Sequence, residues 1–317
     1  LGYVAALALG CILLFSFTRA IDTGERAYAF HWMFVQDPMA LFFKRLFLTA
    51  AILVLLFSVE FSDRLASGVG EYTALTLFAL AGMMFAASAN DFALLFVAVE
   101  LITVTFYVLT SYPRGRLLAL EAGVKYLILG ALASAFLVFG IALIFGTTGR
   151  LNFDEIATVN PELMANPLFQ AGLLMVLGGL AFKIAIVPMQ IWTPDVYQGA
   201  ATPTTAFLAI GSKAAGFALL LRVLFVAVPD AAEHWSRLWI VLSGATILYG
   251  NLCAIPQRNL KRLLGYSSIA HAGYLMLGVA ALTADGQSAV LFYLAGYLFS
   301  VLAAFGVVIV VLRHLEN

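Results

Sequence analysis

The sequence predicts an all-α protein that crosses a membrane many times, and three observations support this prediction. Hydrophobic residues make up 63% of the 317 residues. Charged residues make up only 11%, whereas a soluble domain carries about 25%. Apolar stretches long enough to cross the hydrocarbon core of a bilayer recur from one end of the chain to the other. We therefore expect residues 1–317 to form a single transmembrane domain in a lipid bilayer, without a soluble domain.

Ten apolar segments are candidate transmembrane helices, since one crossing takes about 20 residues. The connections between them are short, and the longest are 20–38 and 147–168. We expect the second of these to be a surface loop with a short amphipathic helix. The predicted spans are 2–19, 39–59, 72–89, 92–111, 118–146, 169–190, 204–227, 236–255, 262–282 and 288–312.

Composition and motifs exclude several classes of protein. The 17 basic and 17 acidic residues give a net charge of zero, so the sequence offers no basic surface for nucleic acid. Cys11 and Cys253 lie in apolar stretches without the spacing of a metal site or a disulfide framework. The sequence contains no glycine-rich nucleotide motif and no ligand set for haem, flavin or iron–sulfur clusters. We therefore expect no cofactor in this chain.

Basic residues predict the orientation of the chain in the membrane, because cytoplasmic loops are enriched in Lys and Arg. They follow the even-numbered spans, which places them at one end of the bundle together with residue 1. We expect that end to face the cytoplasm or matrix. The basic residues are Arg114, Arg116, Arg258, Lys261, Arg262 and Arg313, and the acidic residues of the opposite loops are Asp154, Glu155, Glu162, Asp230 and Glu233.

Four ionisable residues lie well inside predicted spans: Glu100, Lys125, Lys183 and Lys213. Each costs about 2.5–3.5 kcal/mol at the centre of an isolated transmembrane helix. A lysine near a helix end can extend its side chain to the membrane surface, and a purely structural ion pair is a second explanation. Four such residues in one apolar bundle nevertheless favour a functional site, so we expect them to face a polar interior.

Other polar residues recur at helical spacing around these charges. Residues three, four or seven apart share one face of a helix, and opposite charges four apart can pair. His271 is either an ordinary buried side chain or a member of a proton relay, and the sequence does not decide between the two. The shared faces consist of Glu100, Thr103 and Tyr107; Glu121 and Lys125; Ser267, His271 and Tyr274; and Tyr293, Tyr297 and Ser300.

A proline close to one of the lysines predicts a broken helix at Lys183–Pro188. Pro188 has no N–H, so the carbonyl of Ile184 loses its helical partner. A free carbonyl at membrane depth is tolerated where neighbouring helices or water satisfy it, so we expect the break to face the bundle interior. The residues that follow are rich in Pro, Gly and Thr and favour an irregular connector. An ordinary proline kink beside a snorkelling lysine is the alternative.

Four long motifs give the sequence a specific family resemblance. They strongly resemble the antiporter-like membrane subunits of respiratory complex I, and within that group the subunit N family. The segment "DVYQGA" and the lysine of "GSKAAGF" distinguish this family from its sister subunits L and M. The motifs are "FVAVELITVTFYVL", "LEAGVKYLILGALASAFLVFGIALIFGTTGRLNF", "GLAFKIAIVPMQIWTPDVYQGAATPTTAFLAIGSKAAGF" and "NLCAIPQRNLKRLLGYSSIAHAGYLMLG".

The resemblance implies a fold of fourteen helices with inverted five-helix repeats, each of which carries a broken helix. By its motifs this chain corresponds to helices two to eleven, and we expect the remaining helices and a further lysine to lie outside it. The resemblance also implies roles for single residues. Glu100 matches the family's buried glutamate and Lys183 the broken-helix lysine that it partners, while Lys213 matches the lysine of the central axis.

Three further positions follow from the same resemblance, and one departs from it. Lys125 matches an additional lysine early in its helix, and Tyr266 and His271 match the family's "YSSIxH" near the proposed relay. The family usually reads "VPFHxW" where this sequence reads "VPMQIW". Gln190 therefore replaces a histidine, and glutamine cannot carry a proton at neutral pH.

The function that the resemblance implies is proton translocation as a membrane subunit of a bacterial NADH:quinone oxidoreductase in the cell inner membrane. Subunit M and the small subunit K would be its neighbours, and NADH, FMN, iron–sulfur clusters and quinone would bind to partner subunits. One alternative is a stand-alone or Mrp-type cation/proton antiporter. Another is a scaffold that transports nothing.

Overall fold

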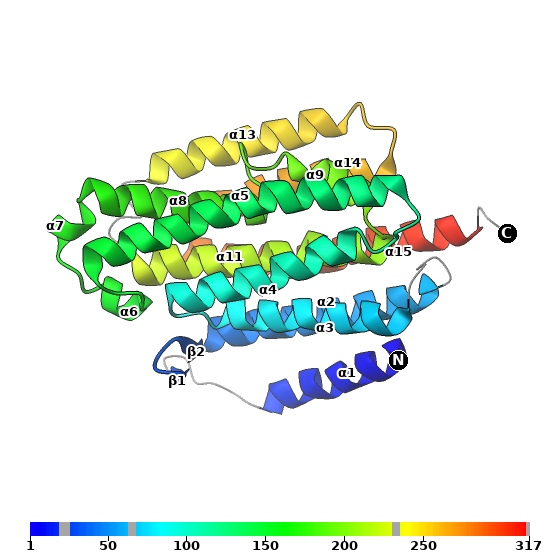
Figure 1. Cartoon of the computed structure of the whole chain (residues 1–317), viewed down its shortest axis with the longest axis horizontal. Helices are drawn as coiled ribbons and strands as arrows, with labels where there is room; N and C mark the ends of the chain where they lie inside the picture. The colour runs from blue at the N-terminus through cyan, green and yellow to red at the C-terminus, as the bar shows by residue number, and fades with distance from the viewer. Residues whose placement is uncertain (19–25, 63–67, 230–234, 315–317) are drawn as a thin grey trace.

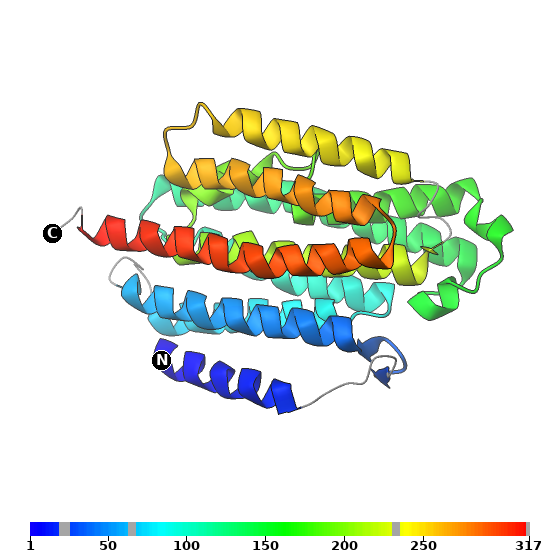
Figure 2. The same cartoon turned by 180° about the vertical axis from the view of Figure 1, so that it is seen from behind.

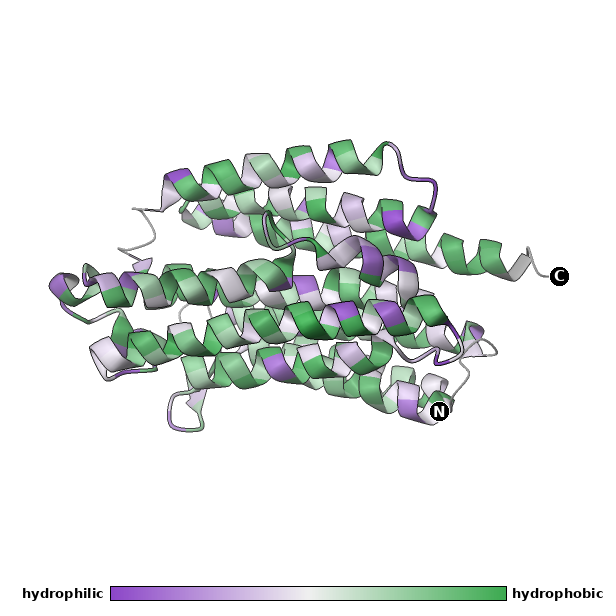
Figure 3. Cartoon of the chain, turned by 45° about the horizontal axis from the view of Figure 1, so that its top comes forward, coloured by the Kyte–Doolittle hydropathy of each residue, from purple (hydrophilic) through white to green (hydrophobic). Residues whose placement is uncertain are grey.

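The structure is a computed structural model that describes residues 1–18, 26–62, 68–229 and 235–314, and it consists almost entirely of helices lying side by side (Figure 1). Nine helices in the described part of the chain are long and apolar enough to cross a membrane, and Gly2–Thr18 is a shorter apolar helix. The ten spans predicted from hydropathy are thus all present as helices. Figure 3 shows hydrophobic residues along most of the helices and hydrophilic residues gathered in the connections.

The helices, in chain order, alternate long spans with short connecting pieces. The fold also contains one two-stranded sheet, formed by β1 (Ala27–Ala29) and β2 (Phe34–Gln36). The helices are α1 (Gly2–Thr18), α2 (Pro38–Glu60), α3 (Val69–Ala87), α4 (Phe92–Thr110), α5 (Leu117–Thr148), α6 (Phe153–Ile156), α7 (Pro161–Met164), α8 (Pro167–Ile184), α9 (Trp192–Gly199), α10 (Thr202–Phe207), η2 (Leu208–Ser212), α11 (Lys213–Arg222), η3 (Val223–Ala227), α13 (Ser236–Ala254), α14 (Leu260–Ala280) and α15 (Ala284–His314).

The central span is Thr202–Ala227, in which α10, η2, α11 and η3 follow one another without a break. In its most apolar 18-residue stretch, 89% of the residues are buried inside the protein. In the corresponding stretches of α5 and α13, 22% of the residues are buried. Figures 1 and 2 show α11 inside the bundle, with α13 at one edge and α1 at the other. Residues of the central span therefore contact protein on all sides, and a polar side chain there must find a partner within the bundle.

The structure confirms that the loops that follow the even-numbered predicted spans lie at one end of the bundle. The N-terminus, the α4–α5 and α13–α14 connections and the end of α15 lie at one end, and the hairpin, α6 and α7 lie at the other (Figure 1). Of the acidic loop residues, Asp230 and Glu233 lie outside the described residues. Which end faces the cytoplasm stays a prediction.

Two predicted connections contain more structure than expected. Segment 20–38 includes the antiparallel hairpin of β1 and β2, in which Ala27 pairs with Gln36 and Ala29 with Phe34. Its turn runs through Phe30, His31 and Trp32, all with positive φ. Because these residues are not the Asn-Gly or Asp-Gly pairs that signal a hairpin, the sequence did not predict it. Segment 147–168 contains two single-turn helices, α6 and α7, in place of the one expected.

The predicted break in the sixth span is present. Helix α8 ends at Ile184, and Ala185 adopts the left-handed conformation with φ of 61°. Side chains from the surroundings satisfy two of the freed backbone groups: Trp192 Nε1 donates to the carbonyl of Phe182 at 2.9 Å, and the Val187 N–H donates to Thr246 Oγ1 at 3.1 Å. The predicted irregular connector is wrong in part, since α9 forms within it.

Helix α9 could form in this stretch because its proline is harmless there. Pro194 is the third residue of α9, and the first N–H groups of a helix have no intrahelical partner to lose. The broken span therefore consists of α8, a turn over residues 185–191, and a second short helix. The break sets Lys183 in the last turn of α8, against the bundle interior.

Candidate functional site

Two lysines lie buried side by side in the bundle, on α8 and α11. The side chains of Lys183 and Lys213 are each only 3% exposed. Gly216 brings their helices together, because a Cβ added there would stand 2.6 Å from Ile184 Cγ2 and 3.3 Å from Lys183 Cγ. Lys213 is three residues before Gly216 and shares its helix face. The two lysines are thus buried on neighbouring helices, and an exchange of protons between their ammonium groups stays a prediction.

Lys183 binds a hydroxyl and not the carboxylate expected to partner it. Its Nζ donates to Thr103 Oγ1 of α4 at 2.7 Å, and Thr103 Oγ1 donates in turn to the carbonyl of Val99 at 2.5 Å. The carboxylate of Glu100 accepts a hydrogen bond from Ser134 of α5. No ion pair joins Glu100 to Lys183, although both side chains are described. The structure therefore brings the two residues into one neighbourhood and leaves them apart.

Lys213 is bound by Ser268 of α14, a residue that the sequence analysis did not select. Its Nζ donates to both the hydroxyl and the carbonyl of Ser268. The same hydroxyl contacts the Tyr197 hydroxyl of α9 at 3.0 Å and accepts from Tyr297 of α15 at 3.1 Å. A serine hydroxyl has one proton and two lone pairs. Ser268 therefore accepts from Lys213 and Tyr297 while its own proton goes to Tyr197.

His271 extends this network, whereas Tyr266 does not. The His271 ring centroid is 4.8 Å from that of Tyr297, and His271 Nδ1 lies 2.5 Å from the hydroxyl of Tyr293. Tyr266 lies elsewhere on α14, with its ring 5.9 Å from the guanidinium of Arg262. The contacts described for Tyr266 are with Arg262 and Tyr249, so its place in the relay stays a prediction.

Lys125 was expected among the buried charges, and the structure corrects this. Its side chain is 45% exposed and forms ion pairs of 2.8 Å with Glu121 and with Asp195 of α9. Arg262 of α14 binds the same Asp195 at 2.5 Å. Lys125 lies only two turns from the start of α5, where α5, α9 and α14 meet. The predicted pairing with Glu121 is confirmed.

The comparison with known families decides the identity. Residues 89–317 match the family described as NADH:quinone oxidoreductase/Mrp antiporter, transmembrane. The chain belongs to this family. The resemblance found in its motifs is thereby confirmed, and the helical fold with a broken span at Lys183 agrees with it.

Within the family, the chain is similar to subunits of NADH-quinone oxidoreductase. The chain is 42% identical over 305 residues to NADH-quinone oxidoreductase subunit N of Moorella thermoacetica, covering 96% of this chain and 63% of the relative. It superposes on a chain of respiratory complex I from Thermus thermophilus with bound aureothin, with a TM-score of 0.79, 36% identity, and coverage of 97% and 64%. A chain of the Mrp complex of a Dietzia species shares the fold, with a TM-score of 0.79, 24% identity, and coverage of 95% and 58%. The chain spans a little under two thirds of the length of these relatives.

The NADH:quinone oxidoreductase/Mrp resemblance pointed to Lys213 but not to the groups that hold it. On α14 the sequence favoured the face of Ser267, His271 and Tyr274, yet Ser268 binds Lys213 and Tyr274 turns outward to Asn251. The sequence offered one signal, the doubled serine of "YSSIAH", without indicating which serine faces inward. The π-helical turn η2, which ends at the residue before Lys213, was also not expected; such turns are frequent at functional sites.

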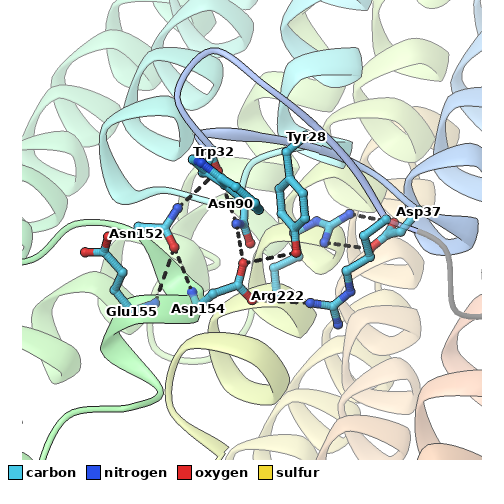
Figure 4. Close-up of polar contacts among 9 residues, drawn as sticks. Tyr28, Trp32, Asp37, Asn90, Asn152, Asp154, Glu155 and Arg222 are labelled. Carbon is cyan, nitrogen blue, oxygen red and sulfur yellow. Dashed lines mark hydrogen bonds and ion pairs between the residues drawn. The ribbon is translucent and has the colours of Figure 1, made fainter.

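Arg222, at the end of α11, is a buried cation that the sequence analysis missed. It forms a bidentate pair with Asp37 at 2.9 and 3.1 Å and donates to the carbonyl of Ala87 at 2.8 and 2.9 Å. Figure 4 shows this pair beside a polar cluster in which Asp154 accepts from Tyr28 and Asn90. Arg222 therefore joins α11 to the start of α2 and the end of α3.

Gln190, which stands where the family usually has a histidine, lies buried in the turn after α8. Its Oε1 has no hydrogen-bond partner among the described residues. The hydroxyl of Tyr107 on α4 shares this property, whereas the hydroxyls of Tyr126 on α5 and Ser212 on η2 interact with each other. A buried polar atom normally has a partner, so Gln190 Oε1 and the Tyr107 hydroxyl are among the exceptions in the described part of the chain.

Proposed function

We propose that the chain is a proton-translocating membrane subunit of a bacterial NADH:quinone oxidoreductase. It lies in the cell inner membrane beside the subunits that correspond to M and K. NADH, FMN, iron–sulfur clusters and quinone bind to partner subunits, and this chain carries protons without a redox step of its own. The observation that supports the proposal is the pair of buried lysines, Lys183 and Lys213, whose hydrogen-bond partners among the described residues are neutral groups.

A lysine with neutral partners suits proton relay better than one in an ion pair. Burial disfavours the charged form of a group, and a nearby opposite charge favours it. Lys183 therefore retains its proton while it is paired with Glu100 and releases it when it turns to Thr103. Moving one charge against about 150 mV requires about 3.5 kcal/mol. A change in one buried charge pair is worth a few kcal/mol, so the switch is large enough to matter.

The route begins at Glu100 and Lys183 and continues to Lys213. The hydroxyls of Tyr126 and Ser212 interact with each other, and Ser212 directly precedes Lys213. Together with ordered water, which transmits hydrogen bonds across gaps, they would bridge the two lysines. From Lys213 the hydroxyl of Ser268 leads to Tyr197, because Ser268 accepts from Lys213 and its own proton goes to Tyr197. Tyr297 donates to the same hydroxyl and packs against the ring of His271, so a branch toward His271 requires that this hydrogen bond reverse. Serine and tyrosine hydroxyls can accept one proton while they donate another, which a chain of apolar side chains cannot do.

Substitution of Lys183 by Met in the assembled complex tests the proposal. We expect proton pumping per electron to fall by tenfold or more while the complex still assembles, because methionine fills the space of lysine without a transferable proton. Quinone reductase activity and acidification are measured in the same vesicles. Met175, an apolar residue of α8 in the lining of a lipid-facing groove, gives a matched control as Met175→Leu. Full pumping by the Lys183 variant would exclude the relay.

Sodium dependence separates this proposal from an Mrp-type antiporter. Both use the same buried charges, and the family description covers both. The identity of 42% to subunit N supports the oxidoreductase, whereas the likeness to the Mrp chain extends to the fold alone. Pumping driven by quinone reduction and indifferent to sodium is expected.

A further inference from the structure

The Glu100–Lys183 pair is held open in this structure by two hydroxyl groups on different helices. Thr103 of α4 accepts from the ammonium of Lys183, and Ser134 of α5 donates to the carboxylate of Glu100. Thr103 is 2% exposed and Lys183 is 3% exposed. Each charged group therefore has a neutral partner of its own and no direct contact with the other.

The two arrangements of Lys183 differ by one turn of α4. Thr103 follows Glu100 by three residues, so both lie on one face of the helix, about 4.5 Å apart along its axis. A lysine side chain with four rotatable bonds covers that distance without movement of the backbone. The alternative position at Glu100 exchanges a neutral acceptor for a charged one. Without the hydroxyl at position 103, the acceptors that remain on this face are the carboxylate of Glu100 and the hydroxyl of Tyr107, and of these the carboxylate alone carries a charge.

Thr103 is also oriented to accept and not to donate. Its proton goes to the carbonyl of Val99 at 2.5 Å, which leaves the oxygen lone pairs for Lys183. Ser134 has the opposite polarity, because it donates to Glu100, and a carboxylate only accepts. The donor and the acceptor thus match the charges that they hold.

We propose that Thr103 and Ser134 are positioning residues that stabilise the open state of the Glu100–Lys183 pair. This inference rests on the proposed relay function and adds the groups that set its equilibrium. Removal of the Thr103 hydroxyl leaves the buried ammonium of Lys183 without its acceptor, and removal of the Ser134 hydroxyl takes a donor from the half-buried carboxylate of Glu100. Either loss favours the closed ion pair, because an unsatisfied charged group is costly. A closed pair keeps the proton on Lys183 and slows its transfer toward Lys213.

The test is Thr103→Val in the assembled complex, with Thr103→Ser as the conservative variant. Valine has the shape of threonine without the hydroxyl, and serine restores it. We expect pumping per electron to fall about tenfold in the valine variant and to stay within about twofold of the unsubstituted complex in the serine variant. Thr105→Val is the matched control, because the hydrogen bond of the Thr105 hydroxyl among the described residues goes to the Leu101 carbonyl of its own helix, at 2.6 Å.

A second variant and a structural measurement keep the inference testable if Thr103→Val does not assemble. Ser134→Ala should lower pumping in the same way, whereas Ser58→Ala, whose hydroxyl bonds its own helix at Leu55, should not. A cryo-electron microscopy structure of either variant should show Lys183 in an ion pair with Glu100. Pumping equal to that of the Thr105 control, or a lysine that stays beside position 103, would overturn the inference.

The failure of this inference and that of the relay are distinguishable. If Lys183→Met pumps fully, the relay itself is wrong. If Lys183→Met abolishes pumping while Thr103→Val and Ser134→Ala pump normally, the relay stands and the two hydroxyls are structural only.

Discussion

Helix α11 carries one buried cation at each end, and the two cations have different kinds of partner. At the end of the helix, Arg222 is 2% exposed. Its two terminal guanidinium nitrogens donate to the carboxylate of Asp37, and its Nε donates to the carbonyl of Ala87. At the start, Lys213 is 3% exposed, donates to Ser268 and lies 5.7 Å from the centre of the Tyr297 ring. Lys213 thus precedes Arg222 by nine positions and, unlike Arg222, forms no ion pair with a carboxylate among the described residues.

The comparison teaches that burial of a charge does not by itself indicate function. A buried cation in a bidentate pair is fixed in charge and position, since removal of either partner leaves an uncompensated charge. A buried lysine with hydroxyl partners keeps its contacts as an ammonium or as a neutral amine, because both forms donate hydrogen bonds. The partner of the cation, and not its depth, therefore separates the structural site from the candidate relay.

The largest expected effect is on stability, and it should distinguish Arg222 from Lys183. We expect Arg222→Met to destabilise the subunit by about 3–5 kcal/mol, because it leaves the carboxylate of Asp37 buried and unpaired. Lys183→Met removes a charge that has no counter-ion and should leave stability unchanged or increase it. Thermal unfolding of the purified complex and the amount of subunit in the membrane measure both. Equal destabilisation by the two variants would contradict the comparison.

The pH dependence of this effect follows from Asp37, which lies before the membrane-spanning part of α2. Burial works to raise the pKa of its carboxyl, but the hydrogen bonds from Arg222 and the Ala40 N–H outweigh burial and lower the pKa below its usual value. A lowered pKa contributes stability above the unfolded-state value of about 3.9, and this stability is lost as the pH falls through the folded-state pKa. In Arg222→Met the interactions with Arg222 that lower this pKa are lost, while burial, which raises it, remains. The difference in stability between the variant and the unsubstituted protein should therefore shrink as the pH falls through the raised pKa of the variant and vanish below the lowered pKa of the unsubstituted protein.

The next effect sharpens the comparison on the lysine side. Ser268→Ala removes the hydroxyl that joins Lys213 to Tyr197 and Tyr297. We expect pumping per electron to fall about fivefold, with less change in thermal stability than for Arg222→Met, because the Ser268 carbonyl still accepts from Lys213. Ser267→Ala on the same helix is the control. Equal pumping by the two serine variants would show that the hydroxyl at position 268 is not part of the route.

The spans and the break could be predicted from the sequence because they depend on local properties. Apolar length fixes a crossing, and Pro188 ends the hydrogen bonding of α8 wherever the helix packs. Lys183 and Lys213 were expected to be buried for the same reason: they lie near the centres of long apolar runs. Lys125 lies near the start of α5 and not at the centre of its apolar run, and its side chain is 45% exposed.

The partners of these residues could not be predicted, since they are set by how the helices rotate and meet. Asp37 and Arg222 are 185 residues apart, and no local pattern connects them. The choice of Ser268 over Ser267 is a rotation of α14 by about 100°. The absence of a direct Glu100–Lys183 contact likewise depends on Ser134, which reaches Glu100 from another helix.

The smallest expected effect concerns the exposed charges around Asp195, which extend the comparison to the protein surface. Asp195 binds Lys125 and Arg262, and the side chains of all three are 30–45% exposed. Surface ion pairs contribute at most about 1 kcal/mol and are screened by salt. Asp195→Asn should therefore lower thermal stability slightly in low salt and not at all in high salt, with pumping unchanged. A severalfold loss of pumping at both salt concentrations would instead assign this cluster, and with it Lys125, to the proton route, since screening cannot restore a proton carrier.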